Sequence, residues 1–279
     1  MQSTSSTADP RDVPFGSLLP FLLIAFGLAW GLVILLILFP EPIEGLFGPL
    51  SASNPLFILA VYAPAIAALV LVLARTGIAG LGRFLSRLLL WRVSPVWYAV
   101  LIIGIPAVYF AGAAWGGTLS AEALVWPGVG AIVFMLVLGP VEEFGWRGYA
   151  LPLLQRRFAP VWAGLILGLI WGIWHLPAFF LSGTPQSGWS FMPFFVGAVA
   201  ISLILTPMFN AARGSVLLPA LFHFQLNNPL WPDAQPYDMY IFAAAAAIVI
   251  WLNRETMFSR DGAAATDVVP PSAGVARAA

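Results

Sequence analysis

The sequence predicts an all-α, polytopic membrane protein: a bundle of about eight transmembrane helices around a polar intramembrane cavity. Of 279 residues, 61% are hydrophobic and only 9% are charged, whereas soluble domains contain about 25% charged residues. Hydrophobic residues gather in runs of about 20, which is long enough to cross ~30 Å of hydrocarbon. The few ionisable residues inside these runs predict the cavity, because charges in the membrane interior are costly unless they serve a function.

The first run is too long for the core of a secretory signal, and no small-residue cleavage pattern follows it. We therefore interpret it as a helix. Several later runs begin at a proline, which suits the first turn of a helix. The predicted spans are residues 17–39, 55–74, 95–115, 127–154, 160–181, 191–211, 215–227 and 237–252.

The segments outside the spans suggest a simple domain organisation. Residues 1–16 are polar and predict a disordered N-terminal tail, and residues 17–258 form the transmembrane helical domain. Residues 259–279 are rich in Ala, Gly, Pro and Ser and predict a disordered C-terminal tail. Residues 81–92 are amphipathic and form either an interfacial helix or an ordinary cytoplasmic loop.

The basic residues indicate the orientation of the chain. All twelve are arginine. With eight spans and a cytoplasmic N-terminus, every arginine outside the spans falls on the cytoplasmic side, as the positive-inside rule requires. Both termini are then cytoplasmic, and the short loops suit a bacterial inner membrane. The opposite loops contain only acidic charges, which are Glu41, Glu44, Glu122, Asp233 and Asp238.

Composition also excludes several classes of function. The formal net charge is zero, so no nucleic acid is expected as a partner. The chain contains no cysteine, which excludes disulfides, thiolate metal sites and a cysteine nucleophile. Catalysis must come from carboxylate, imidazole, hydroxyl or amide groups.

The fourth span contains three ionisable residues, Glu142, Glu143 and Arg147. Each costs about 2.5–3.5 kcal/mol near a helix centre, or roughly 7–10 kcal/mol together before any pairing. Glu143 and Arg147 are four residues apart and are expected to form an ion pair. Glu142 points about 100° away from Glu143 and is expected to have no partner on its own helix.

The two histidines of the chain both fall in predicted spans. His175 lies in the fifth span, and His223 lies in the seventh, four residues before Asn227 and on the same helical face. The predicted depths of Glu142, His175 and His223 overlap, so three helices can present them to one cavity.

Glycines support this convergence. Gly164, Gly168 and Gly172 form a small-residue ridge on the fifth span, and such ridges allow close helix packing. Gly139-Pro140 is expected to loosen the fourth span just before Glu142 and to admit a bend or water.

A carboxylate, two imidazoles and an amide are the groups of a hydrolytic site. A carboxylate can act as a general base on water, and His and Asn can donate hydrogen bonds to an oxyanion. The same Glu142, His175 and His223 could instead bind Zn²⁺ with an open position for water. Structural alternatives are that the histidines bridge helices and that the Glu143–Arg147 pair only supports the fold.

These residues resemble the motifs of the CPBP intramembrane proteases, which include the CAAX prenyl endopeptidases and the Abi bacteriocin-immunity proteins. Glu142-Glu143-x-x-x-Arg147 matches the first motif, and Trp171-x-x-x-His175 is similar to the second, usually Phe-x-x-x-His. Residues 213–227, with His223-x-x-x-Asn227 at their end, resemble the remaining motifs. The resemblance covers about residues 128–230, in the family's order.

The resemblance implies an eight-helix bundle with its site in a membrane cavity. It makes Glu142 the water-activating carboxylate, assisted by His175, and makes His223 and Asn227 the oxyanion site. Glu143 and Arg147 would brace these groups. We favour a site without a cofactor, because no strong ligand beyond Glu142 and the two histidines is evident. Trp171 departs from the family's Phe, and we expect this change to affect packing or substrate access and not chemistry.

The predicted function is an intramembrane endopeptidase acting on a membrane-associated, prenylated or otherwise lipidated peptide or protein within the lipid bilayer. One alternative is a non-catalytic membrane scaffold or bacteriocin-immunity protein with the same fold. Another is a proton-coupled carrier that uses the buried carboxylates as a relay, although no pattern repeats between the two halves of the chain.

Overall fold

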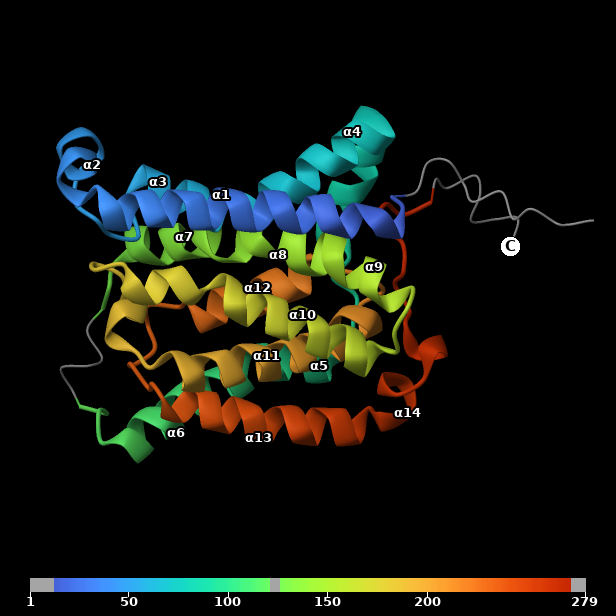
Figure 1. The fold of residues 1–279 in the computed structure, drawn as a ribbon. Coiled ribbons are helices and arrows are strands. Elements are labelled where there is room, and N and C mark those ends of the chain that lie inside the picture. Colours follow the sequence, from blue (N-terminus) through green and yellow to red (C-terminus); the bar gives the residue numbers. More distant parts are fainter. Residues whose placement is uncertain (1–12, 121–125, 272–279) are drawn as a thin grey trace, which may run out of the picture.

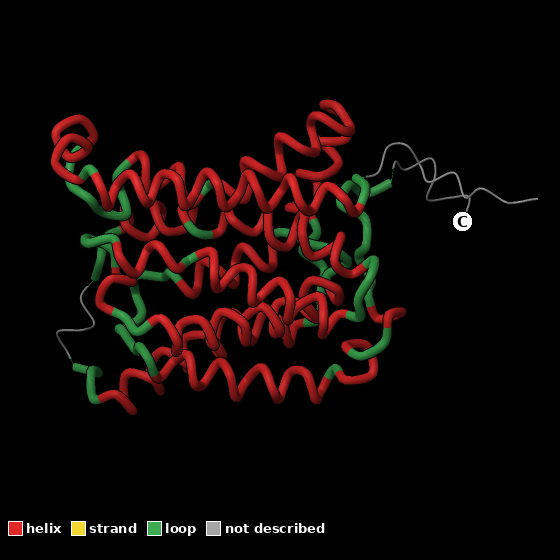
Figure 2. The backbone as a smooth tube through the Cα atoms, viewed as in Figure 1, coloured by secondary structure: helices red, strands yellow, loops and turns green. Residues whose placement is uncertain are grey.

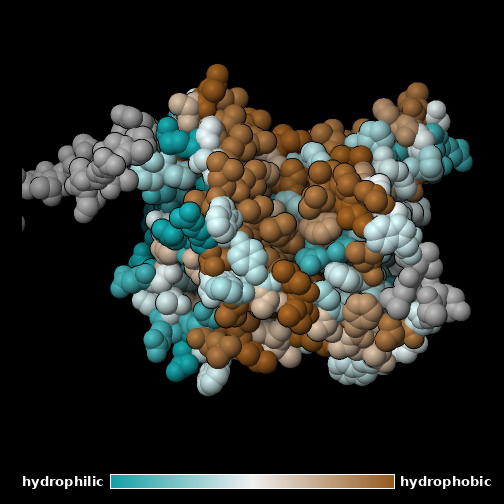
Figure 3. Space-filling model, turned by 180° about the vertical axis from the view of Figure 1, so that it is seen from behind, coloured by the Kyte–Doolittle hydropathy of each residue, from teal (hydrophilic) through white to brown (hydrophobic). Residues whose placement is uncertain are grey.

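The computed structural model describes residues 13–120 and 126–271, and within these ranges it contains helices and loops but no strand (Figure 2). The predicted all-α fold is confirmed. The long helices lie side by side in a layered bundle (Figure 1). Hydrophobic side chains cover the middle of its surface, and hydrophilic ones gather at the end from which the terminal trace leaves (Figure 3). This distribution is typical of a protein embedded in lipid.

Each of the eight predicted spans corresponds to an apolar helical stretch. Among the described residues, six stretches are long and apolar enough to cross a membrane: Phe15–Leu38, Ala63–Leu89, Pro95–Gly116, Val129–Gln155, Pro160–Phe180 and Phe191–Ala211. The two shorter apolar helices are α12 (Leu217–Leu226) and α13 (Tyr237–Leu252).

Residues 13–120, as far as the structure describes this part of the chain, contain nine helical elements. They are η1 (Phe15–Ser17), α1 (Leu18–Leu38), α2 (Pro40–Phe47), α3 (Pro55–Val61), α4 (Ala63–Leu85), η2 (Ser86–Leu89), α5 (Pro95–Ala99), the π-helix η3 (Val100–Gly104) and α6 (Ile105–Gly116).

The remaining described residues form the site and the end of the chain. Their elements, besides α12 and α13, are α7 (Val129–Leu138), η5 (Pro140–Glu142), α8 (Glu143–Gly145), the π-helix η6 (Trp146–Ala150), α9 (Leu151–Gln155), α10 (Pro160–Trp174), η7 (Leu176–Phe180), η8 (Pro185–Gly188), α11 (Phe191–Ala211), α14 (Arg254–Met257) and η9 (Arg260–Gly262).

The second predicted span, residues 55–74, is not one continuous helix. It divides at Tyr62 between α3 and α4, because Pro64 has no N–H to continue the hydrogen-bond ladder. Helix α4 then bends at Gly77, whose φ of +64° is open to glycine but costly for other residues. The amphipathic segment 81–92 is helical as far as Leu89 and not beyond.

The fourth predicted span is also interrupted. Helix α7 ends at Leu138, a 3₁₀ turn holds Pro140–Glu142, and residues 146–150 form a π-helix before α9. The loosening predicted at Gly139-Pro140 is therefore present. Short 3₁₀ and π segments inside a longer helix often mark functional positions. Here the 3₁₀ turn includes Glu142, and the π-helix begins three residues after Glu143.

The predicted glycine ridge of the fifth span packs α10 against α11. A Cβ on Gly164 would lie 2.4 Å from Thr206 Oγ1, and one on Gly168 would lie 2.8 Å from Val199 Cα. Ser202 also donates to the Gly164 carbonyl at 2.9 Å. The two helices approach so closely only because these positions lack side chains.

One end of the bundle, here called the arginine face, consists of the segments 83–94, 156–159, 212–215 and 253–271. Arg87 is 2% exposed and donates to the carbonyls of Gly148, Gly214 and Val268 at 2.7–3.0 Å. Arg156 donates to the Thr266 carbonyl at 2.7 Å.

The predicted disordered C-terminal tail is wrong for residues 259–271, since Val268 is fully buried and the arginines bind several carbonyls of this segment. The low hydrophobicity of this segment suggested disorder. Its main-chain carbonyls can nevertheless bind guanidinium groups, whatever side chains the segment carries. The rest of that tail and residues 1–12 lie outside the described residues.

The other end, here called the acidic face, consists of the segments 39–54, 117–120, 181–190 and 228–236. Thr118 Oγ1 donates to the Asp233 carbonyl at 2.8 Å and so ties two of these loops together. A Cβ on Gly183 would lie 2.0 Å from the Leu50 carbonyl oxygen, so two more are in close contact. Glu41, Glu44 and Asp233 supply the charges of this face.

Candidate active site

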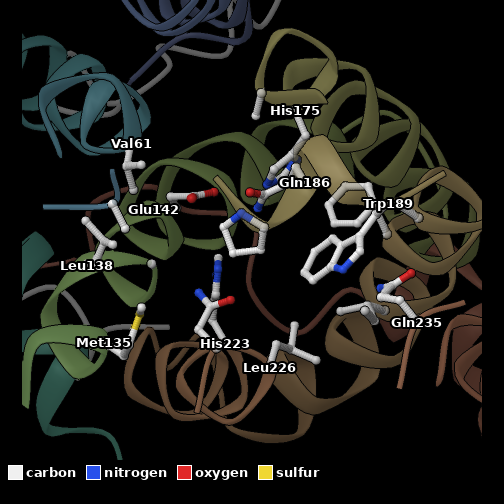
Figure 4. Close-up of a pocket in the computed structure, with 18 of the residues that line it drawn as sticks. Val61, Met135, Leu138, Glu142, His175, Gln186, Trp189, His223, Leu226 and Gln235 are labelled. Atoms are coloured by element: carbon white, nitrogen blue, oxygen red, sulfur yellow. The ribbon is translucent and has the colours of Figure 1, made fainter. Parts of the chain in front are cut away.

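A cavity of about 570 Å³ lies between the helices, toward the acidic face. Four predicted site residues line it, Glu142, His175, His223 and Asn227. Figure 4 shows the labelled Glu142, His175 and His223 arranged around the hollow from three separate segments of the chain. The predicted convergence of the fourth, fifth and seventh spans is therefore present.

Glu142 is held by two tryptophans. Its side chain is 4% exposed, and its Oε2 atom accepts hydrogen bonds from Trp171 Nε1 at 3.0 Å and Trp146 Nε1 at 3.2 Å. The expectation that Glu142 has no partner on its own helix is wrong, because Trp146 follows it by four residues. Both donors are neutral, so they orient the carboxylate without neutralising it, and both bind Oε2, not Oε1.

Trp171 has a larger role than the sequence suggested. We expected its replacement of the family's Phe to affect packing or access, whereas its indole N–H bonds directly to Glu142. Phe has no such donor. The expectation rested on the position being aromatic in either case, whereas the indole N–H was the signal available in the sequence.

Glu143 forms the predicted ion pair with Arg147 and also binds His223. Its Oε1 atom accepts from Arg147 Nη1 at 2.9 Å and from His223 Nδ1 at 2.8 Å. Glu143 and Arg147 are fully buried, and the Arg147 guanidinium lies 4.6 Å from the centre of the Trp171 ring. These four residues, Glu143, Arg147, His223 and Trp171, connect the fourth, seventh and fifth spans.

The two histidines present their Nε2 atoms as the remaining functional groups. His175 Nδ1 donates to the Trp171 carbonyl at 2.8 Å, so Nε2 of the neutral ring carries the lone pair. His223 Nδ1 donates to Glu143, so its Nε2 can donate only when the ring is protonated on both nitrogens. An oxyanion role for His223 therefore requires the imidazolium form.

Gly139 leaves room for the predicted oxyanion donors. A Cβ at this position would lie 2.1 Å from Asn227 Nδ2 and 3.0 Å from His223 Nε2. Both nitrogens thus lie close to one point beside the main chain that precedes Glu142. Any side chain on Gly139 would displace them.

The described residues contain no group of three or more His, Asp or Glu side chains arranged to hold a metal ion. The zinc site considered for Glu142, His175 and His223 needs three ligands that meet at one point. Glu142, His175 and His223 are not such a group in the described structure.

The sequence matches known proteins over its second half. Residues 124–228 match the family model of the type II CAAX prenyl endopeptidase Rce1-like proteins. This segment is Rce1-like. It contains all six predicted site residues and every element from α7 to α12, so the predicted family resemblance is confirmed.

The chain is also similar to CAAX prenyl protease 2 of Methanococcus maripaludis. The two sequences are 32% identical over 144 residues, which cover 47% of this chain and 53% of the relative. The chain therefore matches about half the length of that curated relative.

Proposed function

We propose that the protein is an intramembrane endopeptidase of the CAAX prenyl protease and Abi type, which hydrolyses a peptide bond of a membrane-associated or lipidated substrate. The observation that carries this proposal is the position of Glu142. Its carboxylate is fixed by two indole donors at a cavity that also receives His175, His223 and Asn227.

In the proposed reaction, Glu142 removes a proton from water while the water oxygen attacks the peptide carbonyl carbon. His175 Nε2 accepts a hydrogen bond from the same water and orients it. Asn227 Nδ2–H and the imidazolium Nε2–H of His223 donate to the carbonyl oxygen as it becomes an oxyanion. The proton held by Glu142 then passes to the leaving nitrogen, the C–N bond breaks, and a carboxylic acid and an amine are formed.

Glu143 and Arg147 are proposed to act through His223. The buried Glu143 carboxylate accepts the hydrogen bond from His223 Nδ1 and so fixes the orientation of the ring. Arg147 balances the charge of Glu143 and holds it in place. We propose that the reaction needs no metal, since the described residues hold no group of three His, Asp or Glu side chains arranged to bind one.

The substrate is proposed to be a peptide or protein segment within or at the bilayer, and the location a bacterial inner membrane. A prenylated protein is one such substrate, as the name of the Methanococcus maripaludis relative indicates for that protein. The apolar lining of the cavity suits a hydrophobic segment, whether or not a lipid is attached.

The test is peptide cleavage by purified protein in detergent, followed by mass spectrometry of the products. Glu142→Gln is expected to lower the rate about 10²–10⁴-fold, because it removes the general base. Glu41→Gln, at an exposed carboxylate far from the cavity, is the matched control and should keep full activity.

Three outcomes would count against the proposal. Full activity of Glu142→Gln would exclude the role given to this carboxylate. Inactivation of the wild type by a chelator, with recovery on adding Zn²⁺, would overturn the metal-free reaction. A cellular phenotype that survives Glu142→Gln without any cleavage would favour the non-catalytic scaffold.

A further inference from the structure

A second hollow lies at the arginine face, apart from the candidate active site. It is a groove of about 410 Å³, here called the arginine groove, lined by Leu89, Leu90, Trp91, Arg92, Ala212 and Arg213. The described lining of the cavity around Glu142 includes none of these residues. The arginine groove therefore needs an explanation separate from the proposed endopeptidase.

The two walls of the arginine groove are fixed to each other by Arg87. Its buried guanidinium donates to the Gly214 carbonyl at 2.7 Å, and its own carbonyl accepts from the Val216 N–H at 3.3 Å. On the other wall, the Tyr98 hydroxyl donates to the Trp91 carbonyl. These contacts set the shape of the groove.

Two arginine side chains line the groove without an acidic partner. Among the described residues, the guanidinium groups of Arg92 and Arg213 have no hydrogen bond or ion pair, and no Asp or Glu contributes to the described lining. Both side chains are exposed. A guanidinium offers five N–H donors in a planar fork, which matches the oxygen atoms of a phosphate. Two such forks at one groove indicate an anionic occupant.

Arg213 has a main chain that is unusual for arginine. Its φ is +53°, in the left-handed region that favours glycine, and within the described residues it is the one non-glycine residue with a positive φ. Glycine would adopt this conformation without strain. The arginine is therefore accommodated at a cost in stability, and strained residues of this kind cluster at functional sites.

The groove lies where membrane-spanning helices end. One candidate span, Ala63–Leu89, ends at a lining residue, and another, Phe191–Ala211, ends next to Ala212. The ends of such helices lie at the level of the lipid headgroups. In Figure 3, the hydrophilic surface at this end borders the hydrophobic surface of the middle.

The remaining lining suits the apolar part of a lipid. Leu89, Leu90 and Trp91 are large apolar residues that are exposed beside the two arginines. Tryptophan is enriched at the membrane interface, where its ring contacts both headgroups and acyl chains. A free phosphate ion would satisfy the guanidinium groups and leave these apolar side chains uncovered. A phosphate attached to glycerol and acyl chains would satisfy both.

We propose that the arginine groove binds the headgroup of an anionic phospholipid. Arg92 and Arg213 bind the phosphate oxygens, and the exposed apolar residues contact the glycerol and the first carbons of the acyl chains. Basic pockets between membrane helices bind anionic headgroups in this way. The proposal does not depend on the endopeptidase function or on which side of the membrane the arginine face lies.

The proposal is tested by native mass spectrometry of the purified protein in a neutral detergent. Phosphatidylglycerol and phosphatidylcholine with identical acyl chains are the two lipid probes, and inorganic phosphate is the third. The test variant combines Arg92→Gln with Arg213→Asn, since asparagine tolerates a positive φ. The control combines Arg157→Gln with Arg254→Gln, which removes two exposed arginines of the same face outside the groove.

The wild type and the control should retain phosphatidylglycerol in preference to phosphatidylcholine. The test variant should bind phosphatidylglycerol about tenfold more weakly, because it loses charge-assisted hydrogen bonds to the phosphate. Arg92→Gln alone should weaken binding in the same direction, and it leaves the left-handed position unchanged. Phosphatidylglycerol should also raise the melting temperature of the wild type and the control, but not that of the test variant.

Several results would overturn the proposal. Equal retention of the two lipids by the wild type would show that the anionic headgroup is not recognised. Equal weakening in the test variant and the control would show only a general effect of charge. Displacement of phosphatidylglycerol by a small excess of inorganic phosphate would identify the groove as a site for the free ion.

Discussion

Glu142 and Glu143 are adjacent in sequence but have separate environments. Glu142 faces the cavity and is held by neutral indole donors, whereas Glu143 is buried behind it with Arg147 and His223. We propose that Glu142, the carboxylate without an arginine partner, is the one that accepts a proton from water. This division follows from the helix geometry, because consecutive side chains point about 100° apart.

Trp171→Phe tests the hydrogen bond that the sequence analysis missed. The change keeps an aromatic ring and removes one donor to Glu142, so kcat should fall by roughly tenfold or more, in line with about 1.5–3 kcal/mol for a hydrogen bond to a charged group. KM should change little. Trp174→Phe is the control, because its indole donates to the Ala25 carbonyl and not to Glu142. Equal losses of kcat in both variants would show that the effect is only structural.

Gly139→Ala tests the proposed oxyanion site. The new methyl group would lie 2.1 Å from Asn227 Nδ2 and must push it away. Loss of one oxyanion donor typically costs about 10²–10³-fold in kcat. Gly130→Ala, where a Cβ meets nothing within 4 Å, should keep full activity. Activity of Gly139→Ala at the level of Gly130→Ala would exclude Asn227 from the reaction.

At the scale of elements, the eight hydrophobic runs predicted the helices because lipid requires each span to satisfy its own main-chain hydrogen bonds. Interruptions within spans were harder to predict. Gly139-Pro140 indicated one break, but the π-helix at residues 146–150 has no local sequence signal. It depends on the packing of Trp146 and Arg147 against other helices, which a single sequence does not contain.

Gly168→Val tests the contact between α10 and α11. A larger side chain would meet Val199 and Ser202 at less than 3 Å, and overpacking of this kind costs about 1–3 kcal/mol. The melting temperature in detergent should fall, and activity should fall with it because α10 positions Trp171 and His175. Gly27→Ala, on a part of α1 with free space, is the control. An unchanged melting temperature would show that the helices can separate without loss of stability.

At the scale of the whole molecule, the structure is asymmetric between its two ends. The arginine face is closed by guanidinium groups that bind main-chain carbonyls from distant segments, whereas the acidic face is open to the cavity. The sequence predicted the charge asymmetry and the set of residues at the site. It did not predict the contacts of residues 259–271, because the hydrogen bonds from Arg83, Arg87 and Arg156 go to main-chain carbonyls, which every sequence has.

Arg87→Met tests the closed end. The variant keeps most of the apolar stem but leaves the carbonyls of Gly148, Gly214 and Val268 without this donor. The free energy of unfolding should fall by about 1.5–3 kcal/mol for each charged hydrogen bond that water does not replace. Arg92→Met, at an exposed arginine, should have little effect on the unfolding transition. Similar unfolding transitions for the two variants would contradict the proposal that Arg87 stabilises the arginine face by binding these carbonyls.

The proposed direct activation of water by Glu142 is tested most directly by a single turnover in oxygen-18 water, with protein in excess over a peptide that it cleaves. If Glu142 acts as a general base, one oxygen-18 atom should appear in the new carboxylate of the product, and the protein should remain unlabelled. Oxygen-18 in the Glu142 side chain with an unlabelled product would show that this carboxylate attacks the substrate itself, and would contradict the proposed reaction.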